Sequence, residues 1–182
     1  MTQKWDSIDF EIILRLLKGD AHLRQISKET AVPRSTLSRK LVRLRNSLVI
    51  DYKEEGKNYM FFLRKNLVSL KAVLSAENYK LMKTTEKYNF LLPIFEQLYK
   101  MKGPIILFGS YAKGTAKDDS DIDIYIETKD RPIKERAEAV YSKLSVKIGS
   151  FNKEDLLMQE IIKNHVIIKG AEEYYDRLGF LK

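Results

Sequence analysis

The chain has 182 residues, with 33 Lys and Arg against 25 Asp and Glu and a net charge of +8. It contains no cysteine, which excludes disulfides and thiolate metal sites, and its two histidines are too few and too far apart for a zinc site. No apolar run approaches the ~20 residues of a membrane-spanning helix, and the amino terminus does not have the pattern of a signal peptide. We therefore expect a cytoplasmic protein of two small domains with no membrane segment.

The basic excess lies in the first third of the chain. Residues 1–66 hold 14 Lys and Arg against 8 Asp and Glu, whereas residues 67–182 hold 19 against 17. Segments that bind polyanions carry such an excess. The charge distribution therefore indicates a nucleic-acid partner for the first third.

Three helices and a β-hairpin are predicted for residues 1–66. Apolar residues at helical spacing indicate a helix that ends at Gly19, a second helix over 22–30, and a third helix that begins at Arg34, after Pro33. Two β-rich runs then flank a turn that contains Gly56, which is typical of a hairpin.

This order of elements resembles a winged helix-turn-helix DNA-binding domain. In such a domain the third helix would enter the major groove, and the hairpin turn would touch phosphate or the minor groove. The third helix has no acidic residue. The residues that we expect to contact double-stranded DNA are Arg34, Ser35, Thr36, Arg39, Lys40, Arg43, Lys53 and Lys57. The alternative interpretation is that the helix is only a solvated face, or that the module serves dimerisation.

Residues 67–101 contain no glycine and a single proline, Pro93. Their apolar positions repeat at helical spacing and predict one or two helices, with a break near 83–87 or at Pro93. We assign residues 67–87 to a helical linker and 88–182 to a second domain. The helical stretch is either a homodimer contact or a packing element of its own domains.

Two acidic residues follow a glycine-serine pair in the second domain. Residues 104–108 are a continuous apolar run, typical of a buried strand, and end in Gly109 and Ser110. Ten residues later, residues 121–127 alternate strictly, so Asp121 and Asp123 should project from one face of a second strand. Two such carboxylates repel unless a cation lies between them, and carboxylates completed by waters and phosphate oxygens commonly hold Mg²⁺.

The glycine-serine turn has the features of a phosphate-binding loop. Gly109 has no side chain and lets phosphate approach the backbone closely. Backbone N–H groups at the start of the following helix, with the Ser110 hydroxyl, would bind phosphate oxygens. Lys113 and Gly114 complete the predicted nucleotide-binding residues. Further helices are predicted over 131–144, 153–165 and 171–178, with strands at 144–149 and 166–168.

Together these motifs resemble the nucleotidyltransferase superfamily that includes DNA polymerase β, and more closely the minimal nucleotidyltransferases of archaea and bacteria. The resemblance covers about residues 88–182. It implies an α/β (α+β) fold with a small mixed sheet flanked by helices. It also implies that Gly109 and Ser110 bind the triphosphate, and that the catalytic residues Asp121 and Asp123 hold Mg²⁺ or Mn²⁺.

One family feature is missing. A third carboxylate from a later strand normally helps to bind a second metal and to activate the attacking hydroxyl. The corresponding strand, 144–149, has no acid, and Ser145 or Lys147 stands near the expected position. A lysine there would oppose a second cation. The sequence therefore supports the nucleotide pocket better than it supports turnover.

Two hypotheses for the function follow. In the first, the protein is an enzyme that transfers a nucleotidyl group from a nucleoside triphosphate to an unknown hydroxyl. The resemblance suggests a protein side chain, for example on a HEPN-type partner protein, a small molecule or RNA as acceptor. In the second, it is a catalytically degenerate, nucleotide-sensing transcriptional regulator or antitoxin-like protein.

Overall fold

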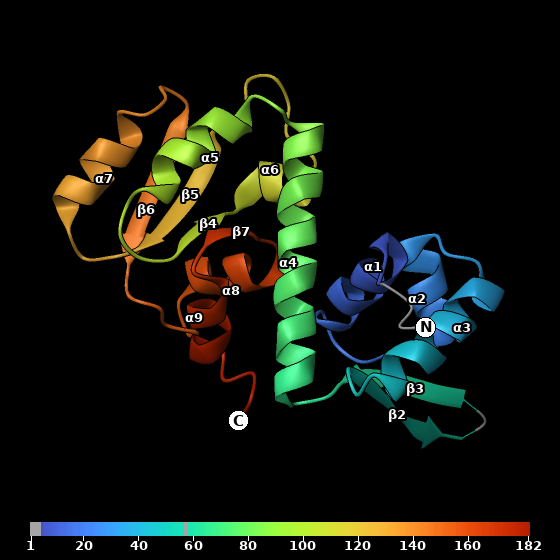
Figure 1. Ribbon diagram of the computed structural model, residues 1–182. Helices are drawn as coiled ribbons and strands as arrows, with labels where there is room; N and C mark the ends of the chain where they lie inside the picture. The colour runs from blue at the N-terminus through green and yellow to red at the C-terminus, as the bar shows by residue number, and fades with distance from the viewer. Residues whose placement is uncertain (1–4, 57) are drawn as a thin grey trace. The chain divides into compact units, whose positions relative to one another are not determined.

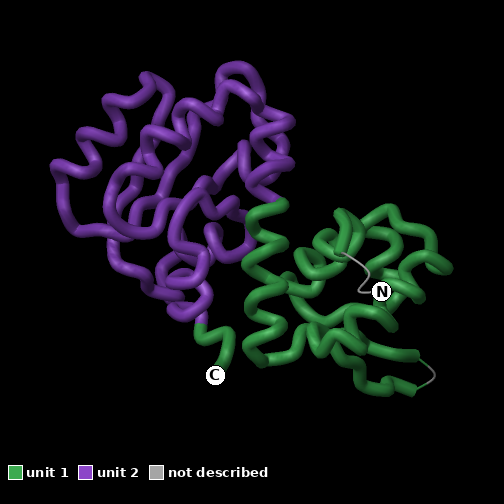
Figure 2. The backbone as a smooth tube through the Cα atoms, in the orientation of Figure 1, with its two compact units in different colours: residues 1–79, 179–182 green, residues 80–178 purple. Residues whose placement is uncertain are grey.

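A computed structural model describes residues 5–56 and 58–182 of the chain. The chain forms two compact units, residues 1–79 with 179–182 and residues 80–178 (Figure 2). Lys57, one of the predicted DNA contacts, lies outside the described residues. Over the described part of the chain, no helix is both long and apolar enough to cross a bilayer.

The first unit begins with three helices, which accompany a three-stranded antiparallel sheet in the order β1-β3-β2 (Figure 1). The predicted helices and the hairpin, formed by β2 and β3, are confirmed. The sequence did not predict β1, because two residues are too few to show a period. The elements are α1 (Ser7–Leu16), β1 (Ala21–His22), α2 (Leu23–Thr30), α3 (Arg34–Asn46), β2 (Ile50–Glu55) and β3 (Asn58–Leu63).

A single helix, α4 (Leu67–Lys87), follows the hairpin, and α5 (Leu91–Tyr99) begins after a short break. Pro93 lies in the first turn of α5, where its missing N–H is tolerated. The boundary between the two units falls inside α4, after Tyr79. The Tyr79 ring stacks on Phe10 with 5.4 Å between centroids, so this part of α4 packs as an element of the first unit.

The second unit is built on a four-stranded mixed sheet in the order β6-β5-β4-β7. Strands β5 and β6 are parallel, and the other pairs are antiparallel. The small mixed sheet that the sequence predicted is therefore confirmed. The strands are β4 (Ile105–Leu107), β5 (Ile122–Glu127), β6 (Leu144–Gly149) and β7 (Val166–Lys169), and the remaining helices are α6 (Gly109–Lys113), α7 (Arg131–Glu138), α8 (Leu156–Lys163) and α9 (Ala171–Arg177).

Two helices are shorter than the sequence predicted. Helix α7 ends at Glu138 because the following residues turn into β6, with the Leu144 N–H bonded to the Tyr141 carbonyl. Helix α8 begins only at Leu156, because the Asn152 side chain accepts a hydrogen bond from the Glu154 N–H and holds a turn there.

The two faces of this sheet carry different helices. Ile122, Ile124 and Ile126 of β5 belong to a core that α5 and α7 also contribute to. Asp123 and Tyr125 alternate with them and project from the opposite face. Figure 1 shows α5 and α7 on one side of the sheet, and α8 and α9 on the other. This alternation decides which helices face the candidate carboxylates.

Candidate functional site

The structure brings the glycine-serine turn against Asp123. The chain leaves β4 at Leu107 and enters α6 at Gly109, whose backbone has a φ of +69°. A Cβ at position 109 would collide with the Asp123 carboxylate oxygen Oδ2. The Phe108 N–H also donates to the Asp123 carbonyl at 2.9 Å. The start of α6, where phosphate is predicted to bind, therefore lies directly against one of the predicted metal ligands.

Asp121 directly precedes β5, and Asp123 is the second residue of this strand. The intervening Ile122 and the following Ile124 are fully buried, while Asp121 is exposed and Asp123 is half-buried. Burial raises the pKa of Asp123, and the nearby Asp121 charge raises it further, whereas a hydrogen bond from Ser145 lowers it. A half-buried carboxylate beside a second one is a group that a bound cation would stabilise.

Ser145 is the residue directly opposite Asp123 on the neighbouring strand. In the parallel register of β5 and β6, Asp123 pairs with Ser145 and Tyr125 pairs with Lys147. No third carboxylate therefore lies beside the pair on this strand. Within residues 5–56 and 58–182, no group of three or more acidic or histidine side chains is placed to hold a metal ion. Two carboxylates are still enough for a Mg²⁺ ion whose other ligands are phosphate oxygens and waters.

Lys113 and Gly114 lie at the end of α6. The Lys113 ammonium group donates to Glu160 of α8 at 2.8 Å. The Glu160 charge also raises the pKa of Asp123. Sequence reasoning missed Glu160 because only the folded sheet brings α8 next to α6. Gly114 ends α6 in the left-handed conformation, with a φ of +72°, and its carbonyl accepts from Lys87 at 2.8 Å.

The predicted DNA-contacting residues of α3 lie on two sides of that helix. Of the predicted residues, Arg34, Ser35 and Arg39 are exposed and Thr36 is half-buried. Ser38 and Val42 of the same helix are also exposed. These residues form an outward stripe because they recur three or four positions apart. The stripe is opposite the buried leucines of α3.

Lys40 and Arg43 are instead bound within the first unit. Both side chains pair with Asp9 of α1, which is fully buried, and Lys40 also pairs with Asp6. Their charges are therefore already neutralised by α1. Lys53, on the hairpin, lies 3.4 Å from Asp20, and its side chain is half-exposed. We consequently base the DNA proposal on the exposed stripe and not on Lys40 or Arg43.

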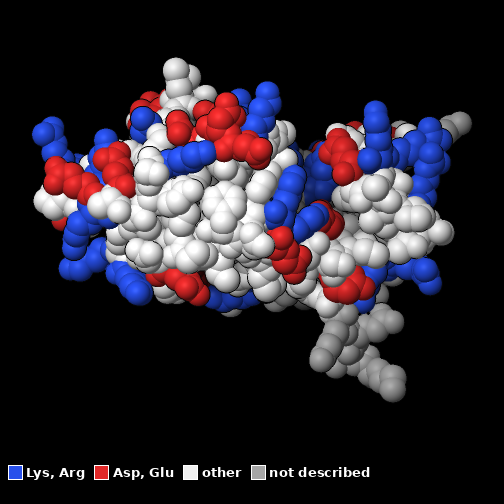
Figure 3. All heavy atoms as spheres, turned by 90° about the horizontal axis from the view of Figure 1, so that it is seen from above, with Lys and Arg blue, Asp and Glu red and all other residues white. Residues whose placement is uncertain are grey.

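The second unit, residues 80–178, has 17 Lys and Arg residues against 16 Asp and Glu residues. Figure 3 shows Lys and Arg side chains interspersed with Asp and Glu side chains over the part of the molecule that this unit forms. The first unit is the one with the basic excess. The first unit is therefore electrostatically better suited than the second to bind a polyanion.

Comparison with known proteins places the second unit in a family. Residues 90–176, which contain the glycine-serine turn and both aspartates, match the Nucleotidyltransferase domain family. A protein of Methanocaldococcus jannaschii named "Putative protein adenylyltransferase" is 38% identical over 80 residues, which are 44% of this chain and 79% of that relative. No solved structure matches the chain significantly. The chain therefore belongs to the nucleotidyltransferase domain family.

Proposed function

We propose that this protein transfers a nucleotidyl group from a nucleoside triphosphate to a hydroxyl acceptor. Gly109 and Ser110 would hold the triphosphate, assisted by Lys113, and Asp121 and Asp123 would hold Mg²⁺ or Mn²⁺. The observation that carries this proposal is the close approach of the Gly109 backbone to the Asp123 carboxylate, where a Cβ at position 109 would collide with Oδ2. When bound, the metal would neutralise the triphosphate and polarise its phosphoryl oxygens.

The step itself is a substitution at the α-phosphorus. The acceptor oxygen forms a bond to this phosphorus, and the bond between the α-phosphorus and the oxygen that bridges to the β-phosphorus breaks. Pyrophosphate leaves with the bonding electrons, and the hydroxyl proton passes to solvent. The chain's own contribution is to orient the triphosphate against α6 and to fix the carboxylate pair on β5.

The name of the relative supports a protein acceptor and an adenylyl donor. We therefore propose ATP as the donor and a side-chain hydroxyl of another protein as the acceptor. A HEPN-type partner protein is one such acceptor. Incubation of the full chain with labelled ATP, Mg²⁺ and cell lysate should label a protein band, and Asp121→Asn and Asp123→Asn should abolish the label. Labelling that persists in both variants would contradict the proposal.

The second candidate function is that of a nucleotide-sensing DNA-binding regulator. Two observations favour it: Ser145 stands where another acid would help catalysis, and α3 presents exposed Arg34 and Arg39. A regulator would bind ATP with Mg²⁺ without forming product, and its affinity for duplex DNA would change when ATP is added. The labelling experiment and a DNA titration with and without ATP separate the two functions.

A further inference from the structure

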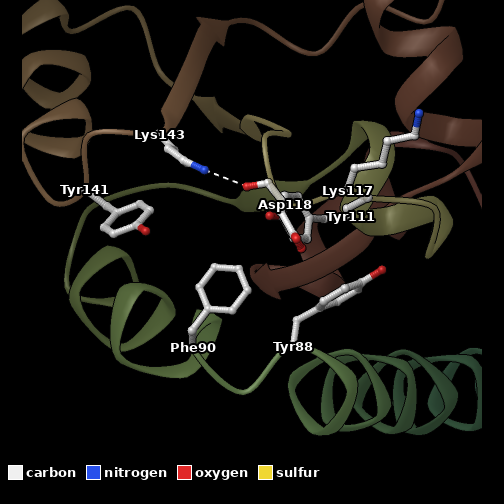
Figure 4. Close-up of a pocket in the computed structure, with 8 residues that line it drawn as sticks. Tyr88, Phe90, Tyr111, Lys117, Asp118, Tyr141 and Lys143 are labelled. Atoms are coloured by element: carbon white, nitrogen blue, oxygen red, sulfur yellow. Dashed lines mark hydrogen bonds between the residues drawn. The ribbon is translucent and has the colours of Figure 1, made fainter.

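Three lysines around the carboxylate pair differ in what their ammonium groups bind. The Lys113 ammonium pairs with Glu160 at 2.8 Å. The Lys143 ammonium donates to the Asp118 carbonyl at 2.6 Å, beside a pocket of about 260 Å³ (Figure 4). No hydrogen bond or ion pair joins the Lys147 ammonium to any residue that the structure describes, and this side chain is exposed. Of these three lysines, Lys147 is therefore the one that can bind a ligand without giving up a partner.

Lys147 lies on the face of the sheet that carries Asp123. Burial raises the pKa of Asp123, whereas a hydrogen bond from Ser145 and the charge of Lys147 lower it. The Ser145 side chain is therefore on the Asp123 face, and Lys147, two residues later in the strand, projects from the same face. The intervening Val146 is 1% exposed and belongs to the core on the other face. The Lys147 ammonium therefore acts on the Asp123 carboxylate from the neighbouring strand.

The residue directly opposite Lys147 leaves space on the Asp123 side. In the parallel register of β5 and β6 this residue is Tyr125. The Tyr125 hydroxyl donates to the Gly149 carbonyl at 3.1 Å. Its ring therefore leans toward Gly149, two residues beyond Lys147 and away from Asp123. The flexible lysine stem can thus reach toward the carboxylate without crossing this ring.

The strand order places Lys147 and the glycine-serine turn on opposite sides of Asp123. The order is β6-β5-β4-β7, the turn follows β4, and Lys147 lies in β6. Neighbouring strands are about 4.8 Å apart, so roughly 10 Å separate β4 from β6. A phosphate chain that starts at Gly109 and Ser110 and crosses the metal beside Asp123 would next meet Lys147.

A second divalent cation has few ligands at this place. Asp123 faces the neutral hydroxyl of Ser145 on β6. Over the described part of the chain, no three acidic or histidine side chains converge as a metal site would require. Mg²⁺ prefers oxygen ligands, of which carboxylates are the anionic ones, and a neighbouring ammonium group repels it. A lysine, in contrast, carries its positive charge permanently at this position and is a good point-charge partner for phosphate.

We propose that the Lys147 ammonium binds the triphosphate on the β6 side of Asp123, so that the site holds a single divalent cation. This inference rests on the proposed nucleotide site and adds to it the group that neutralises the phosphate chain beyond the metal. Lys147 then takes the place of a second cation and is a phosphate-binding residue.

The number of Mn²⁺ ions bound per chain, measured by electron paramagnetic resonance with saturating α,β-methylene ATP, tests the proposal. This analogue cannot release pyrophosphate, so turnover does not affect the result. The wild type should bind one Mn²⁺ with the analogue. Lys147→Met keeps the unbranched stem and removes the charge, so it should weaken analogue binding by about tenfold, and Lys147→Arg should restore it. The matched control is Lys134→Met, which removes the same charge from α7, on the other side of the sheet (Figure 1), and should bind as the wild type does.

The two ways in which the experiment can fail are distinguishable. Ions that the double variant Asp121→Asn and Asp123→Asn still binds are subtracted, because they lie outside the site. If the wild type then binds two Mn²⁺, or if Lys147→Met binds the analogue as tightly as Lys134→Met, this inference is overturned and the proposed nucleotidyl transfer stands. If the wild type does not bind the analogue with Mn²⁺, both are overturned. Because Lys147 is exposed, its variants should unfold at the wild-type temperature, so that weaker binding reports the lost charge.

Discussion

Gly109 and Asp123 constrain each other at the level of single residues. The positive φ of Gly109 is a conformation that residues with a side chain rarely adopt, and the Asp123 carboxylate fills the direction in which a Cβ would point. Asp123 in turn is half-buried, and its burial and the Asp121 charge raise its pKa, against the Ser145 hydrogen bond and the Lys147 charge, which lower it. The site therefore stores unfavourable electrostatics that a cation and a triphosphate would relieve.

Gly109→Ala should abolish ATP binding and lower stability. The added methyl group forces either a strained backbone or a displaced Asp123, and strain at such a position costs about 1–3 kcal/mol. Titration with ATP and Mg²⁺, together with thermal unfolding, measures both effects. Gly56→Ala is the matched control, because Gly56 has a similar φ of +61° but nothing within 4 Å of the new Cβ. If both variants bind ATP equally well, the contact with Asp123 is not part of a nucleotide site.

Asp123→Asn should make the protein more stable at neutral pH. The folded-state pKa of Asp123 is raised above its ordinary value of 3.8, so the folded protein binds this proton more tightly than the unfolded chain does. Stability is therefore lost as pH rises from about 3.8 through the raised pKa, and Asn removes that loss. Melting temperatures from pH 3 to 8 should show a gain for the variant that shrinks at the acid end. Asp119→Asn, which removes a charge from an exposed position, should show no such pH-dependent gain.

Contacts between helices explain two features at the level of elements. Helix α8 supplies Glu160, which holds the Lys113 ammonium of α6 at 2.8 Å. Helix α1 supplies the fully buried Asp9, which pairs with Lys40 and Arg43 of α3. The ion pair with Glu160 engages the Lys113 ammonium, which would otherwise be available to phosphate. The ion pairs of Asp9 with Lys40 and Arg43 hold α3 against α1, while the opposite face of α3 stays exposed.

Glu160→Gln should tighten triphosphate binding several-fold. Lys113 would no longer have an anionic partner in the ligand-free protein and could pair with phosphate without first breaking an ion pair. Stability should change little, because both side chains of the pair are well exposed. The measurement is the dissociation constant for tripolyphosphate with Mg²⁺, with Glu154→Gln as a control outside the pair. Weaker binding would instead indicate that Glu160 assists the site.

Asp9→Asn should destabilise the first unit by about 3 kcal/mol, because it leaves two cations without their buried partner. Asp9 also accepts a hydrogen bond from the Asp6 N–H at 2.8 Å in the capping box of α1. Denaturant unfolding measures the loss. Glu138→Gln, which removes one partner of an exposed pair with Lys134, should change stability by less than about 0.5 kcal/mol. Equal effects of the two variants would show that the Asp9 pairs do not stabilise the unit.

At the scale of the whole molecule, the two units divide the chemistry between them. The nucleotidyltransferase domain match and the carboxylate pair both lie in the second unit. The exposed stripe of α3 and most of the net positive charge lie in the first. We therefore propose that nucleotide binds to the second unit and that duplex DNA binds to the first.

Binding of the full chain to duplex DNA should weaken steeply with salt. Each phosphate contact releases condensed counterions, so the logarithm of the binding constant should fall linearly with the logarithm of salt concentration, by about 0.9 per contact. Arg34→Glu and Arg39→Glu should lower the affinity at least tenfold and reduce this slope. Arg136→Glu changes the same charge on α7 and should have a much smaller effect. Affinity that is independent of salt would remove the DNA-binding proposal.

The sequence by itself determined most of the helices and strands, and its motifs pointed to the glycine-serine turn and the two aspartates of the candidate site. The strict alternation of 121–127 predicted β5, and the apolar run before Gly109 predicted β4, because both patterns are local. The strand that pairs with β5, 144–149, contains no acidic residue. Only the tertiary structure decided that Ser145 pairs with Asp123, that Glu160 holds Lys113, and that Asp9 binds Lys40 and Arg43. These contacts depend on strand register and helix packing. They join residues that are 22 to 47 positions apart in the sequence, and no local periodicity of the sequence could have revealed such pairs.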